Sequence, residues 1–250
     1  MLVQDLVMLH KWMNQNKLTV NISKTKYMLF NTSKINNIEI SYGHSAIERV
    51  GVFKYLGVYL DEQLKWNEHI SKLSSKLAQE AGVFRWISDC VPVETKRNLY
   101  FSLFHSRLTY GILVWGTANK TSLKSLQTIQ NKAIKNLFGY HQRTSTSFIH
   151  SKHKILTVGN VYTYAACKHV YCILHGAMHT NTTLNRLYDQ HHHNTRGRDC
   201  LISHRRNTTT FGQNSAVNRA SALYNSLQQD LKVLPENSFK TQLKTYLFSQ

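Results

Sequence analysis

The pattern of apolar and polar positions changes near residue 61, from short mixed segments to long helical ones. At the start, Leu2, Leu6, Leu9 and Met13 recur every three or four residues, which predicts an amphipathic helix over residues 2–15. Four short segments with the spacing or composition of strands follow, at 19–23, 26–30, 37–42 and 50–60. The last of these is nearly continuous in apolar and aromatic residues, which predicts a strand covered on both faces.

Beyond residue 61 the apolar period becomes helical. One stripe has spacings of three and four, as expected for the packed face of a helix: Ile70, Leu73, Leu77, Ala81 and Phe84. A second stripe lies about a third of a turn away and is basic: Lys65, His69, Lys72 and Lys76. The pattern therefore predicts a helix that packs on one side and carries positive charge on a neighbouring side.

Further helices follow in the second half of the chain. Pro92 is placed to open a helix that runs towards Trp115, and Thr121 can cap the next one, which ends at Gly139. Additional helices are predicted at 158–175, 216–231 and 238–248. The stretch near 179–215 is rich in His, Asn, Thr and Arg, which predicts a long mobile connection. A small sheet followed by a helical region indicates an α+β fold.

Charge changes this picture more than any other bulk property. Lysine and arginine number 31 against 13 acidic residues, for a formal net charge of +18 and an isoelectric point near 9.8. From Thr95 to Tyr188 there are twelve basic residues and no acidic one. Such a surface attracts polyanions, which favours nucleic acid. An anionic membrane fits less well because the cations are spread over many elements. A basic protein with no such role is the remaining alternative.

The sequence also indicates where the protein resides. It contains no apolar run of the roughly 20 residues needed to span a bilayer, and its first residues lack the features of a signal peptide. The four cysteines are scattered, which disfavours a disulfide framework: Cys90, Cys167, Cys172 and Cys200. An intracellular location in the nucleus or cytoplasm, without secretion or membrane insertion, is expected.

Several segments, in order along the chain, resemble reverse transcriptases of non-LTR (LINE-type, jockey-like) retrotransposons. Residues 16–30 resemble the segment that follows the catalytic aspartates of that family, and residues 53–58 resemble its primer grip. The resemblance continues through segments at 66–70, 108–116, 126–134, 194–196 and 238–244. It implies the end of a palm at 1–62, a helical thumb with its following helices at 63–140, and a basic helical C-terminal region at 141–250. The implied fold is α+β, with a small partial palm-type sheet and an N-terminal helix before the helical thumb.

The resemblance also implies roles for four residues of the first part. Lys24 matches the palm lysine near the departing pyrophosphate, where a cation can neutralise developing charge. Tyr55, Leu56 and Gly57 match the loop that holds the primer end, and glycine permits close approach of a strand. From the residues alone, a solvated lysine at a strand end and a glycine in a bulge remain open alternatives.

In the thumb, the resemblance implies that one face of the helix at 66–87 follows the duplex backbone. The residues of the basic stripe are the candidates for phosphate contacts: Lys65, His69, Lys72 and Lys76. An ordinary solvated helix face is the alternative. The expected partners are RNA, DNA or their hybrid, bound through backbone phosphates.

Polymerisation requires carboxylates that hold two metal ions, and in this family they precede the segment that contains Lys24. The chain has no Asp-Asp pair, and its only adjacent acids are Asp61 and Glu62, which are expected in a solvated turn. We therefore expect a reverse transcriptase fragment that binds nucleic acid but does not polymerise alone. No catalytic residue or cofactor is expected within it, since Mg²⁺ belongs to the complete polymerase. The alternative is an incomplete gene model of an active enzyme.

A repurposed structural or zinc-binding protein is the other alternative. The chain has one cluster with metal-ligand chemistry: His191, His192, His193, Cys200 and His204. Its spacing matches no ordinary zinc module, which favours a solvated histidine tract in a loop. Cys167 and Cys172 lie on a predicted helix among apolar residues, where they are expected to be core side chains.

Overall fold

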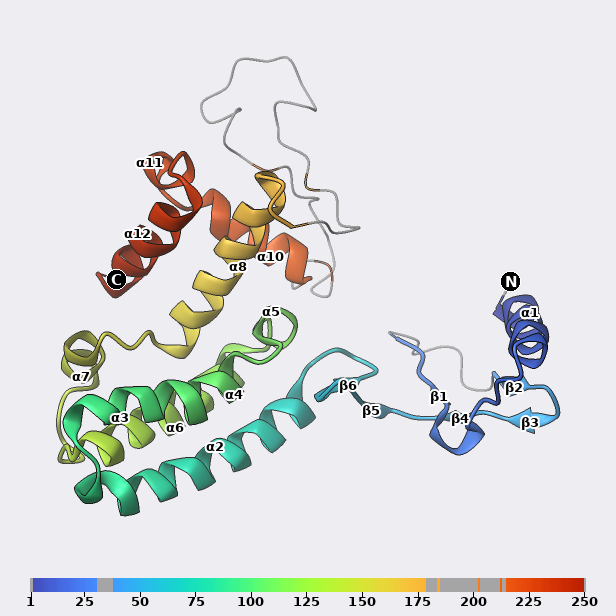
Figure 1. Ribbon diagram of the computed structural model, residues 1–250, viewed down its shortest axis with the longest axis horizontal. Helices are drawn as coiled ribbons and strands as arrows, with labels where there is room; N and C mark the ends of the chain where they lie inside the picture. The colour runs from blue at the N-terminus through green and yellow to red at the C-terminus, as the bar shows by residue number, and fades with distance from the viewer. Residues whose placement is uncertain are drawn as a thin grey trace. The chain divides into compact units, whose positions relative to one another are not determined.

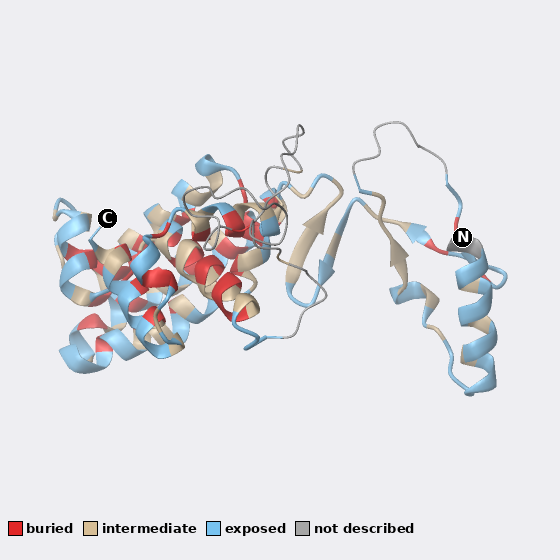
Figure 2. Cartoon of the chain, turned by 90° about the horizontal axis from the view of Figure 1, so that it is seen from above, coloured by how far each residue is buried: buried red, intermediate tan, exposed pale blue. Residues whose placement is uncertain are grey.

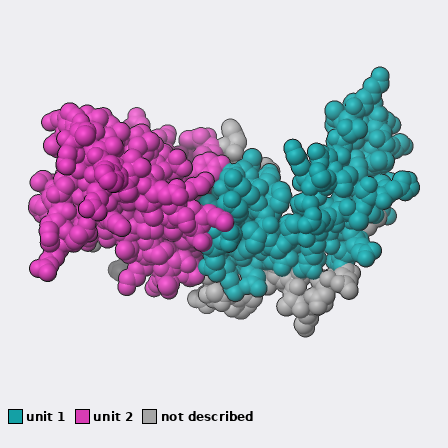
Figure 3. Space-filling model, turned by 90° about the horizontal axis from the view of Figure 1, so that it is seen from below, with its two compact units in different colours: residues 1–69 teal, residues 70–250 magenta. Residues whose placement is uncertain are grey.

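The computed structural model describes residues 2–30, 38–178, 184, 202, 212 and 215–249. The chain forms two compact units, Met1–His69 and Ile70–Gln250, which Figure 3 colours separately. Small sheets occur in the first unit and helices dominate the second, so the described chain is consistent with an α+β fold. The division at 62 and 140 implied by the family resemblance stays a prediction.

The first unit combines one helix with three two-stranded sheets (Figure 1). Strands β1 and β4 pair in parallel, β2 and β3 pair antiparallel, and β5 and β6 form an antiparallel hairpin. The elements are α1 (Leu2–Gln15), the 3₁₀ turn η1 (Ile22–Lys24), β1 (Lys26–Tyr27), β2 (Ser41–Tyr42), β3 (Ser45–Ala46), β4 (Glu48–Arg49), β5 (Val52–Tyr55) and β6 (Val58–Asp61). The helix predicted at 2–15 is confirmed.

A small apolar cluster holds part of this unit together. Ile40, Tyr42 and Ile47 are buried, and four half-buried side chains pack against them: Leu6, Val20, Ile22 and Tyr27. This cluster joins α1 to the short strands, because Leu6 comes from the helix and Tyr42 from β2. The strands themselves are only two to four residues long, which gives each sheet few backbone hydrogen bonds.

Two strand predictions in this unit are wrong. Residues 50–60 do not form one strand covered on both faces, because Leu56 (φ +44°) and Gly57 (φ +86°) turn the chain back on itself between β5 and β6. Positive φ at both central positions is the signature of a type I′ hairpin turn. The alternating segment at 19–23 is also not a strand, because the Asn21 side chain accepts a hydrogen bond from the Lys24 amide and caps η1.

Helix α2 begins at the end of the first unit and continues in the second. The second unit consists of helices. In chain order they are α2 (Asn67–Ile87), the 3₁₀ turn η2 (Ser88–Cys90), α3 (Val93–Leu99), the π-helix η3 (Tyr100–His105), α4 (Ser106–Thr109), α5 (Ile112–Trp115), α6 (Lys120–Phe138), α7 (Thr146–His153), α8 (Val158–Leu174), α10 (Ala216–Asn225), α11 (Gln229–Lys232) and α12 (Glu236–Phe248). Helix α8 lies at the centre and contacts α5, α6, α10 and α12. Figure 2 shows buried residues running through these helices.

Most helix predictions are confirmed, with differences at the ends. The apolar stripe from Ile70 to Phe84 is buried as expected. The cap of α6 is Asn119 rather than Thr121, since the Asn119 side chain accepts the Ser122 amide at 2.7 Å. Helix α7 is absent from the predictions. The helix expected at 216–231 is two, α10 and α11, which are separated at residues 226–228.

The segment at 108–116, part of the family resemblance, forms a tight joint between α4 and α5. Gly111 begins α5 with a left-handed backbone (φ +64°), and the Trp115 indole donates a hydrogen bond to the Tyr110 carbonyl at 2.8 Å. A Cβ atom on Gly116 would lie 2.3 Å from the ring of Tyr162 on α8. Glycine is therefore required there by close approach of α8, not by an unusual backbone angle.

The segment at 126–134, also part of the resemblance, carries a buried polar network on α6. The fully buried Gln130 amide donates to the Tyr100 hydroxyl at 2.8 Å and to the Leu156 carbonyl at 2.9 Å. The Gln127 side-chain oxygen Oε1 accepts a hydrogen bond from the Val158 backbone amide at 2.7 Å, at the start of α8. Since a buried polar group without a partner is costly, these glutamines fix the chain that leads into α8.

Part of the predicted connection near 179–215 lies outside the described residues, including His191, His192, His193, Cys200 and His204. Cys167 and Cys172 are buried and unbonded to each other, as expected for core side chains. Among the described helices, none has the length and apolar character that crossing a membrane requires.

Candidate nucleic-acid interface

The predicted primer-grip residues lie at the tip of the β5–β6 hairpin. Tyr55 ends β5, and Leu56 and Gly57 form the turn. The side chains of Tyr55 and Leu56 are 58% and 74% exposed. A leucine with positive φ is strained, and here it holds an apolar side chain in solvent. The turn therefore presents two apolar side chains beside a glycine, a combination that permits contact with a partner.

Lys24 is an exposed residue at the end of η1, two residues before β1 begins at Lys26. Its backbone amide is held by Asn21. The neighbouring Lys26 is paired with Glu48 across the parallel strands. Lys24 is thus an exposed cation at the end of a 3₁₀ turn, and its role as a palm lysine stays a prediction.

The adjacent acids Asp61 and Glu62 serve the local structure. The Asp61 carboxylate accepts hydrogen bonds from the backbone amides of Gln63, Lys65 and Trp66 at 2.8 to 3.1 Å. Glu62 pairs with Arg49 at 3.0 Å. Asp61 therefore organises the turn that leads into α2. Within the described residues, no group of three or more His, Cys, Asp or Glu side chains is arranged to hold a metal ion.

The basic stripe on α2 is only partly exposed. Lys72 and Lys76 are exposed on the helix, and Lys65 is exposed in the turn before it. His69 does not share that face, because it is 6% exposed and its Nδ1 accepts the Tyr59 amide at 3.4 Å. Burial also lowers the pKa of His69, which favours the neutral ring. The placement of His69 on a solvent-facing basic stripe is therefore wrong.

Carboxylates also lie on α2, at Glu68 and Glu80. Glu80 is half-buried, and it pairs with Arg107 of α4. Burial raises the pKa of Glu80, while Arg107 and Lys76 oppose that rise. Arg107 is therefore the ion-pair partner of this carboxylate, and Lys76 contributes a second positive charge near it.

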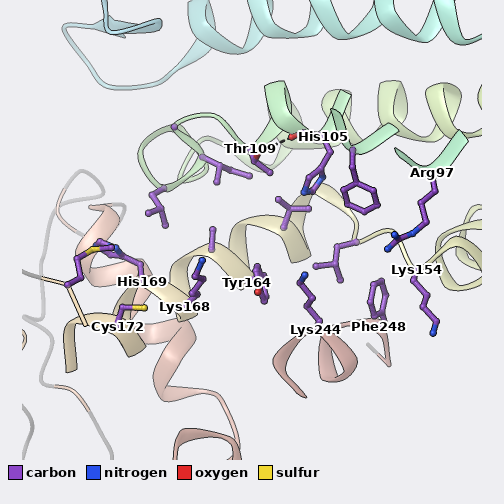
Figure 4. A pocket seen from close by; sticks show the side chains of 18 residues that line it. Arg97, His105, Thr109, Lys154, Tyr164, Lys168, His169, Cys172, Lys244 and Phe248 are labelled. Atoms are coloured by element: carbon purple, nitrogen blue, oxygen red, sulfur yellow. Dashed lines mark hydrogen bonds between the residues drawn. The ribbon is translucent and has the colours of Figure 1, made fainter. Parts of the chain in front are cut away.

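A pocket of about 580 Å³ opens in the second unit, and no sequence motif indicates it. Helices α3, η3, α8 and α12 contribute most of its wall (Figure 4). Four cations line it: Arg97, Lys154, Lys168 and Lys244. Three aromatic rings lie among them: Phe101, Tyr164 and Phe248. No carboxylate is among the described residues that line it, in agreement with the acid-free stretch from Thr95 to Tyr188.

The two histidines of the pocket are neutral near pH 7. Burial, together with the charge of Lys244, lowers the pKa of His105 to about 4. Burial also lowers the pKa of His169. The π-helix η3 carries both Phe101 and His105, and such segments frequently occur at functional sites. The pocket thus combines fixed positive charge with uncharged rings that can exchange hydrogen bonds.

Comparisons with known proteins agree with the resemblance seen in the sequence. The chain is 22% identical over 151 residues to a Drosophila melanogaster protein named "Probable RNA-directed DNA polymerase from transposon X-element". It is 24% identical over 139 residues to the RNA-directed DNA polymerase from mobile element jockey of the same fly, and 22% identical over 153 residues to that of Drosophila funebris. These matches cover 59%, 54% and 60% of the chain.

The same matches cover only 17%, 15% and 17% of the relatives, so the matched part of the chain corresponds to about a sixth of their length. No family model matches the chain. No solved structure matches it either.

Proposed function

Because the curated relatives of this chain are RNA-directed DNA polymerases of retrotransposons, we propose that it is a nucleic-acid-holding part of such a reverse transcriptase. In this proposal residues 1–62 correspond to the end of the palm, 63–140 to the thumb and 141–250 to the C-terminal region. The chain binds RNA, DNA or their hybrid through backbone phosphates.

Helix α2 carries the proposal. Its apolar stripe from Ile70 to Phe84 is buried, while Lys72 and Lys76 on the same helix are exposed. A helix anchored on one side can hold cations in a fixed row against a phosphate backbone. The net charge of +18 draws the polyanion towards this row over distances greater than a contact.

The chemistry of polymerisation lies outside this proposal. Two-metal catalysis requires clustered carboxylates, and the sequence contains no Asp-Asp pair. Asp61 caps a turn and Glu62 pairs with Arg49, so both acids already serve the fold. We propose that the chain binds nucleic acid without polymerising by itself.

Binding of a labelled RNA–DNA hybrid at several salt concentrations tests the proposal. The double variant Lys72→Ala/Lys76→Ala should reduce the dependence of log affinity on log salt by about 2, because each lysine accounts for about one phosphate contact. The matched control is Lys120→Ala/Lys124→Ala, which removes two exposed lysines with the same spacing from α6.

Three outcomes would overturn parts of the proposal. Affinity that hardly changes with salt would exclude binding through backbone phosphates. An unchanged affinity in the α2 variant would exclude the thumb assignment of that helix. An equal loss in the α2 and α6 variants would assign the binding to net charge rather than to α2. Circular dichroism of each variant establishes that it is folded.

A further inference from the structure

We propose that the pocket lined by η3, α8 and α12 binds a short run of unpaired nucleotides of a single-stranded nucleic acid. The pocket is separate from the exposed lysines of α2, since none of its lining residues belongs to that helix. It therefore adds a second binding mode to the proposed function, and each can be tested without the other.

The charge of the pocket favours an anionic ligand. Within the described part of the chain, none of its four cations (Arg97, Lys154, Lys168 and Lys244) forms an ion pair. The carboxylate that acts on Lys168 is Glu236, which is already paired with Lys240. Like charges gathered around one cavity repel each other, and a bound anion relieves that repulsion.

The cations are spread along the pocket rather than gathered at one end. Figure 4 shows Arg97 and Lys154 at one end, His169 and Cys172 at the other, and Lys244 and Tyr164 between them. Along α8 the lining runs from Val161 to Cys172, which at 1.5 Å per residue is about 16 Å. Charges distributed over this length suit a ligand that repeats its phosphate, not one that carries a single anionic group.

The aromatic rings favour bases over other anionic ligands. Arg97 lies 4.7 Å from the ring centre of Phe101, and Lys244 lies 5.2 Å from that of Tyr164. Each pair places a cation over one face of an aromatic ring. Sites for single strands commonly combine aromatic rings, on which bases stack, with lysine or arginine side chains that contact the phosphates. In a duplex the bases are already stacked on each other, so this surface is suited to unpaired ones.

His105 lines the pocket together with the cations and the aromatic rings. Its Nδ1 is buried and has no hydrogen-bond partner among the described residues. Burial and the charge of Lys244 lower the pKa of His105 to about 4, so its imidazole is uncharged near pH 7. A neutral imidazole among the lining residues can exchange a hydrogen bond with the edge of a base without adding charge to the pocket.

The test compares a labelled 12-nucleotide single strand with the same sequence as a blunt duplex, using fluorescence anisotropy on the full chain. Lys168→Ala/Lys244→Ala should weaken single-strand binding about tenfold or more and change duplex binding less than twofold. The control Lys120→Ala/Lys124→Ala removes two exposed cations of α6 that lie outside the pocket lining and should leave both affinities within twofold.

The aromatic part of the proposal has its own variant and probe. Phe248→Ala should weaken binding of the single strand about fivefold or more but not binding of an abasic strand of equal length. Phe248→Tyr should retain the affinity of the natural protein, which distinguishes lost stacking from lost folding.

Four results would overturn the inference. An abasic strand that binds as tightly as the natural one would reduce the pocket to an anion site. Equal losses for strand and duplex in the Lys168/Lys244 variant would exclude selectivity for unpaired nucleotides. Competition by adenosine monophosphate at micromolar concentration would identify a free-nucleotide site instead. Equal or greater competition by an acidic peptide, or binding to anionic vesicles that the Lys168/Lys244 variant loses, would assign the pocket to another ligand. The outcome of the Lys72→Ala/Lys76→Ala test on α2 bears on none of these results.

Discussion

The two units of this protein bury their apolar side chains to very different degrees. Residues 70–250 pack large side chains such as Trp115, Tyr100 and Phe239 with almost no exposure, whereas the core cluster of residues 1–69 rests on Ile40, Tyr42 and Ile47. The first unit also leaves many large apolar side chains in solvent, including Val7, Met8, Trp12, Val52 and Leu56. Figure 2 shows the same contrast.

The contrast follows from the elements that each unit contains. Long helices such as α2, α6 and α8 each present a continuous apolar stripe that neighbouring helices can cover. Two-stranded sheets of two to four residues have little face to bury and are only marginally stable by themselves. Large exposed apolar groups commonly mark contact surfaces, so the first unit has the character of a segment that gains stability from contact with further protein or nucleic acid.

Hydrogen exchange of the full chain should give the largest measurable difference between the units. Amides of β5 and β6 should exchange at least about a hundredfold faster than those of α8, because a marginal hairpin opens far more often than a packed helix. Mass spectrometry of peptides from residues 52–61 and 158–174 provides the measurement. Comparable protection in both peptides would mean that the small sheets are stabilised as well as the helices, and the contrast would fail.

Substitution at two glycines should separate close packing from an open surface in the second unit. Gly116→Ala should lower the free energy of unfolding by about 3 kcal/mol, because its Cβ would overlap the Tyr162 ring and the Ile112 carbonyl. Gly159→Ala, in α8 with no atom near the added methyl group, should raise it by about 0.5 kcal/mol. Urea unfolding monitored at 222 nm gives both values.

A loss at Gly116 that is no larger than the change at Gly159 would show that α8 can move away from α5. The second unit would then be less tightly packed than its buried residues indicate, and the difference between the units would be smaller.

Acidification should have a smaller effect, per pH unit, than the Gly116 substitution, and it should act through the second unit. The pKa of His105 is about 4 in the folded protein and near 6.5 when unfolded. Between these values the unfolded chain binds a proton that the folded chain does not, so stability falls as the pH drops from 6.5 to 4. The loss attributable to this histidine reaches about 1.4 kcal/mol per pH unit.

His105→Asn should remove that part of the pH dependence. Urea unfolding at pH 7, 6, 5 and 4 compares the variant with the natural protein, and the difference between their slopes isolates His105 from the carboxylates that titrate in the same range. Identical slopes would mean that His105 takes up its proton in the folded state and is more hydrated than its burial implies.

Much of the helical unit could be predicted from the sequence, because helix formation depends on residues three and four apart. The stripe of α2, the range of α8 and the stop of α6 at Gly139 all follow from local spacing and capping. The two strand errors arose at turns, where the conformation of one or two residues decides the path of the backbone. Residues 50–60 form a hairpin because Leu56 accepts positive φ, a conformation that its side chain disfavours and that no local pattern indicates.

For the candidate sites, the sequence determined the charge and the tertiary structure determined its arrangement. The net charge, the acid-free stretch and the ordered family resemblance are properties of the chain itself. Burial of His69 beside Tyr59 depends on how β6 lies against the start of α2. The pocket exists because folding brings Arg97, Lys154, Lys168 and Lys244 to one cavity from four separate segments. Spacing along the chain cannot encode that convergence, since it depends on how the helices pack in three dimensions.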